Sequence, residues 1–93
     1  MDAREEAILT AADIARDGEA LTCAALDGDL NEARFRATLI LDKASAVGLC
    51  EVMATAARVL ERLGPMGGQP HAGYGDAILQ LASAIDVLWF DRR

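Results

Sequence analysis

The sequence predicts an all-α protein: an up-and-down antiparallel bundle of four to five helices that forms one domain over residues 1–93. Much of the 53% apolar content is alanine, and aromatic residues make up only 4%. Alanine is the strongest helix former and lets helices pack closely. Apolar residues recur three and four positions apart along most of the chain, which is the helical period. No alternating β-branched run reaches strand length, which argues against a sheet.

The first helix is expected from about residue 3 to residue 15, with acidic residues at its start that complement the helix dipole. The Asp17-Gly18 pair then interrupts the pattern. Helical spacing continues to Leu26, so this region forms either a second short helix or one kinked helix.

The next helix is predicted from about Leu30 to Val47, because Gly28 suits the end of the preceding helix and Asp29 suits an N-cap. Gly48 marks a break, after which apolar spacing resumes and continues to a stop at Gly64-Pro65. The buried stripe is expected to comprise Leu30, Ala33, Ala37, Ile40 or Leu41, Ala44 and Val47 before Gly48, and Leu49, Val52, Met53, Ala56, Val59, Leu60 and Leu63 after it.

Residues 64–73 are rich in glycine and proline and predict a flexible loop. The last helix is expected to begin near Tyr74, with Asp76 in its first turn. Its predicted buried residues are Tyr74, Ile78, Leu81, Ala82, Ile85, Leu88 and Trp89.

The charge balance disfavours two classes of partner. A net charge of −6 would repel nucleic acid and anionic membranes. The N-terminal sequence lacks the features of a signal peptide, and no apolar run is long enough for a membrane span, so the chain is predicted to be cytoplasmic. In that compartment Cys23 and Cys50 are expected to be reduced thiols that serve as small core residues.

The residues that could support chemistry are sparse. His71 is the only histidine and lies in the Gly/Pro loop, so neither a catalytic triad nor a histidine metal cluster can be assembled. The single acids Glu51, Glu61 and Asp86 have the spacing of a solvated helix face. We therefore expect no enzyme activity, no metal site and no cofactor.

One segment, Ala37 to Gly48 (ATLILDKASAVG), has a family resemblance. It resembles the A-H-x-L-K-G-x-x-x-x-L-G motif of the histidine phosphotransfer (HPt) domain, a four-helix bundle of two-component phosphorelays. Ala37, Ile40 and the Val47-Gly48 pair match in kind, and the two following helices are similar, so that the resemblance covers roughly residues 20–91. It implies an HPt-like fold in a signalling protein. The alanine richness and the preference for arginine over lysine, with Lys43 as the single lysine, separately indicate a bacterial sequence.

The motif positions that carry phosphoryl chemistry differ. The phosphorylated histidine falls on Thr38, the motif lysine on Leu41 and the close-approach glycine on Asp42. Aligning Lys43 with the motif lysine instead moves Ile40 to the histidine position. Since threonine offers no imidazole and no activating base, the resemblance implies a domain that does not transfer phosphate.

The resemblance also implies a protein-interaction surface formed by Thr38, Leu41, Asp42 and Ser45, with a receiver domain or a histidine kinase as partner. An alternative is an unrelated helical module that forms a homodimer through the side that carries Leu39 and Leu41. An enzyme or a phosphocarrier that uses His71 is a third alternative. The sequence leaves open whether Leu41 is exposed or buried by the N-terminal helices.

Overall fold

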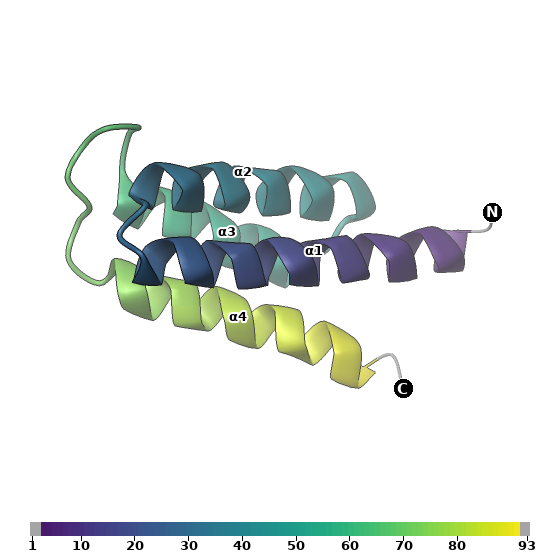
Figure 1. Cartoon of the computed structure of the whole chain (residues 1–93). Helices are drawn as coiled ribbons and strands as arrows, with labels where there is room; N and C mark the ends of the chain where they lie inside the picture. The colour runs from purple at the N-terminus through teal and green to yellow at the C-terminus, as the bar shows by residue number, and fades with distance from the viewer. Residues whose placement is uncertain (1–2, 92–93) are drawn as a thin grey trace.

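A computed structural model describes the backbone of residues 3–91 and the side chains of residues 4–88. It contains α1 (Ala3–Leu26), α2 (Leu30–Val47), α3 (Cys50–Leu63) and α4 (Tyr74–Asp91), and this described part holds no strand (Figure 1). The prediction of an all-helical bundle is confirmed, with four helices. None of the helices described is both long and apolar enough to cross a membrane.

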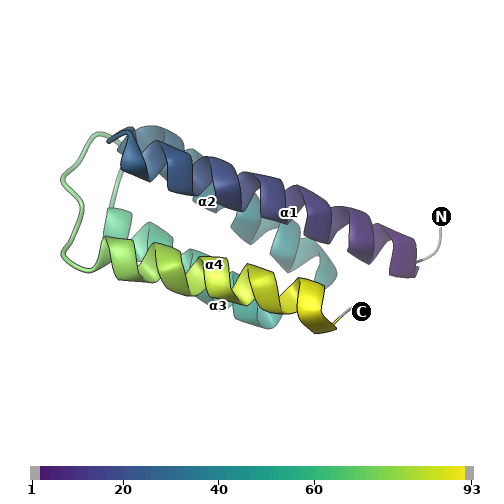
Figure 2. The ribbon, with the colours of Figure 1, turned by 60° about the horizontal axis from the view of Figure 1, so that its bottom comes forward.

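Helices that follow one another in the chain are neighbours in space, and α1 closes the bundle by packing, less extensively, on α4. Figure 2 shows α1 and α2 as one layer and α3 and α4 as the other. The side of the bundle formed by α2 and α3 therefore lies opposite the side formed by α1 and α4. The start of α1 and the end of α4 lie at the same end of the bundle, opposite the 64–73 loop (Figure 1).

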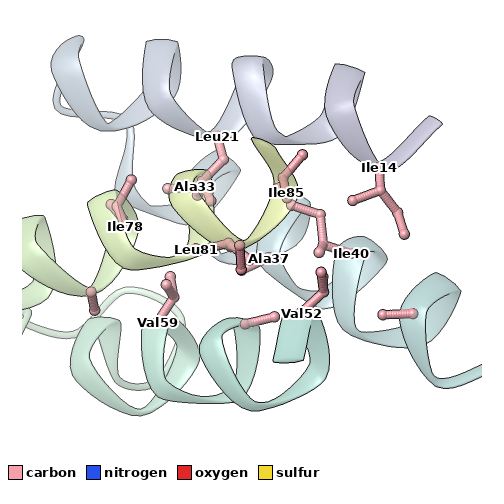
Figure 3. Packing of buried hydrophobic residues seen from close by; sticks show 14 of the residues in the cluster. Ile14, Leu21, Ala33, Ala37, Ile40, Val52, Val59, Ile78, Leu81 and Ile85 are labelled. Carbon is pink, nitrogen blue, oxygen red and sulfur yellow. The ribbon is translucent and has the colours of Figure 1, made fainter. Parts of the chain in front are cut away.

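The core fills the space between the two layers with aliphatic side chains from all four helices (Figure 3). Small residues stand among the large ones, which lets the helices pack closely. The largest side chains that are almost completely buried are Ile14, Leu21, Ile40, Val52, Val59, Leu63 and Leu81.

The Asp17-Gly18 pair does not interrupt α1, which is one continuous helix. A Cβ atom at Gly18 would lie 2.9 Å from the Ile85 Cδ1 atom, so glycine allows α1 and α4 to approach each other here. The buried Asp17 carboxylate accepts hydrogen bonds from Lys43 Nζ at 2.7 Å and from Arg36 Nη1 at 3.1 Å. Asp17 and Gly18 were expected to interrupt the helix, but they instead form contacts of α1 with α2 and α4.

The predicted ends of α2 are confirmed. The Asp29 Oδ1 atom accepts a hydrogen bond of 3.2 Å from the Glu32 backbone N–H, as an N-cap should. Gly48 ends the helix with a φ of 74°, the left-handed conformation that glycine adopts without a steric cost.

Arg34 is the main feature of the core that was not predicted from the sequence. It lies on the buried side of α2 with 3% of its surface exposed. Its Nη2 donates to the Leu63 carbonyl at 2.6 Å and to the Gly68 carbonyl at 2.8 Å, and its Nε donates to the Gly64 carbonyl at 3.1 Å. The guanidinium therefore satisfies backbone carbonyls at the C-terminus of α3, where a positive charge is also favoured by the helix dipole.

Asn31 extends this contact into the loop. Its Oδ1 accepts from Arg34 Nη1 at 2.7 Å and from the Gly67 backbone N–H at 2.8 Å. The His71 backbone N–H donates to the Arg62 carbonyl at 2.6 Å. These bonds tie two parts of the 64–73 loop to α2 and α3.

Three further expectations differ from the structure or lie outside it. Cys23 and Cys50 are free thiols, as expected, but both are exposed, so their assignment to the core is wrong. Val47 is also exposed, because it lies in the last turn of α2, beyond the last buried residue of the helix, Ala44. The Trp89 side chain lies outside the described residues.

Candidate functional site

The surface predicted from the HPt resemblance lies on α2. Thr38, Asp42 and Ser45 are exposed, and their spacing of three and four residues brings them to one side of the helix. The cap at Asp29 and the left-handed Gly48 fix the two ends of this helix. The structure therefore brings three of the four predicted residues together on an accessible surface.

Leu41, the fourth residue, is half-buried and packs against the core. Its position in the helix is one turn from the buried residues Ala37 and Ala44, which explains why it turns inward. The exposed part of the predicted surface is consequently small and polar, rather than the apolar patch that an exposed Leu41 would create. Leu39 is also half-buried.

The Thr38 hydroxyl already has a hydrogen-bond partner. Its Oγ1 donates to the carbonyl oxygen of Arg34, one turn earlier in α2, at 2.9 Å. A threonine hydroxyl needs an adjacent base to become a nucleophile. The single histidine is not brought to it, since His71 lies exposed in the loop that leads to α4.

The single lysine in the chain serves another contact. Lys43 lies on the side of α2 that faces α1, where it pairs with the buried Asp17. Arg36 shares that carboxylate and also pairs with Glu32 Oε2 at 3.0 Å. Hydrogen bonds to Glu32 and then to Asp17 raise the pKa of Arg36 above its ordinary value. Both cations therefore stabilise the α1–α2 contact instead of adding positive charge beside Thr38.

No group of three or more histidine, cysteine or carboxylate side chains within the described region is arranged to hold a metal ion. Glu51, Glu61 and Asp86 are exposed, in agreement with their predicted place on solvated faces. The exposed side chains on this side of α2 include the small polar ones of Thr38, Asp42 and Ser45.

Two grooves between helices were not predicted. One runs between α3 and α4, has a volume of about 750 Å³ and is lined by apolar residues together with Glu51 and Arg58. The other runs between α1 and α4, has a volume of about 540 Å³ and is lined by apolar residues together with Glu19 and Asp86. A sequence pattern indicates which residues lie outside the core, but it does not indicate which helices are adjacent. Neither groove could therefore be predicted.

Comparison of the chain with protein-family models, with curated proteins and with solved structures finds no match.

Proposed function

We propose that this protein is a cytoplasmic, HPt-like signalling adaptor that binds a two-component receiver domain or a histidine kinase and transfers no phosphate. The observation that supports this proposal most is the environment of Thr38. The residue at the motif's histidine position is exposed near the middle of α2, as a docking residue must be, yet its hydroxyl is bonded to the Arg34 carbonyl.

The arrangement of the helices agrees with the proposal. The motif lies on the second helix, and its glycine, Gly48, forms the tight turn into the antiparallel α3. Thr38, Asp42 and Ser45 are accessible to a partner that approaches this side of the bundle, as is the 47% exposed Phe35, one turn before Thr38.

The motif's lysine position supports the proposal that the protein transfers no phosphate. Phosphoryl transfer needs a positive charge near the transferred group, because negative charge is spread over its oxygens. The motif's lysine position holds Leu41, which packs against the core, and Lys43 is paired with Asp17 on the other side of α2.

Binding can be tested with a panel of purified receiver domains and kinase dimerisation domains, measured by titration calorimetry against this protein. Ser45→Arg should weaken binding at least about tenfold, because it puts a long charged side chain into the contact. Ser83→Arg is the matched control: it makes the same change at another exposed serine, on α4, and should bind as the wild type does.

Two results would contradict the proposal: no member of the panel binds, or Ser45→Arg and Ser83→Arg weaken binding equally. Sedimentation of the wild type tests the alternative homodimer. A stable dimer that Ser45→Arg dissociates would favour self-association over an adaptor role.

A further inference from the structure

The α1/α4 groove carries an inference that is independent of the α2 surface. Its lining contains two acids, Glu19 on α1 and Asp86 on α4, and no basic side chain among the residues that the structure describes. Small residues, Ala15, Gly18 and Ala82, lie between large aliphatic ones from the core. The groove therefore combines an apolar floor with negative charge on both helices.

Two exposed apolar residues extend this surface along α1. Ile8 is 40% exposed and Leu26 is 82% exposed. They are separated by five turns of about 3.6 residues, so they lie on one line along the helix. Ala15 and Thr22 line the groove, and their positions around the helix axis lie within about 40° of that line. The stripe from Ile8 to Leu26 is about 27 Å long.

We propose that the α1/α4 groove binds an amphipathic helix of another protein, one with a narrow apolar face flanked by lysine or arginine residues. A helix fits because the groove runs between two helices, whose backbone donors and acceptors are already used and cannot pair with a strand. Small residues on the floor let a third helix approach closely. Basic flanks would pair with Glu19 and Asp86 and would be attracted by the net charge of −6.

A second copy of this chain fits the groove less well. A two-fold interface places the same surface on both sides, so that the acids of one protomer would face those of the other. Such like-charge contacts oppose association. The groove also lies opposite the α2/α3 side, and the proposed helix would leave Thr38 and Ser45 free.

The two exposed cysteines make a direct test possible. Cys23 lines the α1/α4 groove and Cys50 lines the α3/α4 groove. The probe is an 18-residue synthetic helix with leucine and alanine on one face and lysine on both flanks. It should bind the wild-type protein and slow the alkylation of Cys23 at least about fivefold, while Cys50 reacts at its free rate. The same peptide with glutamate in place of lysine should not bind.

Ala82→Arg should weaken binding of the lysine peptide at least about tenfold, because it places a bulky cation in the groove. Ser83→Arg adds the same side chain one residue later, on the other side of α4, and should leave binding unchanged. Circular dichroism would confirm that both variants keep the wild-type helix content. Protection of Cys50 instead of Cys23, equal protection of both, equal binding of the two peptides, or no binding would overturn the proposal.

Discussion

Arg34→Met should lower the free energy of unfolding by about 3 kcal/mol, because it removes the donors of a buried backbone network. The carbonyls of Leu63 and Gly68 would lose the Arg34 guanidinium, and Asn31 would lose one of its two donors. Urea unfolding followed by circular dichroism at 222 nm measures the change.

Arg62→Met provides the matched control, because Arg62 is exposed and lies in the last turn of α3. Its effect should stay within about 0.5 kcal/mol. Arg34→Lys should recover only part of the loss, since an ammonium group cannot reach several carbonyls as a planar guanidinium does. Equal stability of Arg34→Met and Arg62→Met would show that the network contributes nothing.

Leu81→Ala should cost about 2–5 kcal/mol, because it leaves a cavity at the centre of the bundle. Leu81 is 1% exposed and packs in the core between the two layers (Figure 3). Leu79 lies on the same helix, carries the same side chain and is 66% exposed. Leu79→Ala should therefore change stability by less than about 0.5 kcal/mol.

Thermal and urea unfolding of both leucine variants distinguish a specific core from a loosely collapsed one. A small protein has little stability to lose, so Leu81→Ala should be largely unfolded well below the melting temperature of the wild type. Similar losses for the two variants would mean that the assignment of the inner and outer faces of α4 is wrong.

Much of the fold could be predicted because its signals are local. Helical period, the N-cap at Asp29 and the glycines at positions 48 and 64 depend on residues within one or two turns. These local signals gave the ends of α2 and the existence of α3 and α4.

The remaining features depend on contacts between distant residues. Arg34 and Asp17 can be buried because distant groups pair with them: backbone carbonyls with Arg34, and cations of α2 with Asp17. A sequence pattern alone assigns charged residues to the surface. Gly18 resembles a helix breaker until Ile85 on α4 is known to lie against it. One signal was available for Arg34: it falls within the apolar stripe of α2, next to Ala33.

The candidate site was predicted only in part, because burial depends on contacts between residues that are distant in the sequence. Exposure of Thr38, Asp42 and Ser45 agrees with their spacing, whereas the burial of Leu41 depends on its contacts with the core. The acidic α1/α4 groove requires knowledge of which helices are neighbours.

The central claim is that Thr38 occupies the histidine position of an HPt-like surface that cannot accept phosphate. It is tested most directly by phosphate transfer from a radiolabelled receiver domain that binds the wild type. The wild-type protein should remain unlabelled. Thr38→His combined with Leu41→Lys in a His71→Gln background should gain acid-labile phosphate, because it supplies both the exposed imidazole and the cation that the wild type lacks on this side of α2. Labelling of the wild type, or a variant with both substituted motif residues that binds the receiver and stays unlabelled, would contradict the claim.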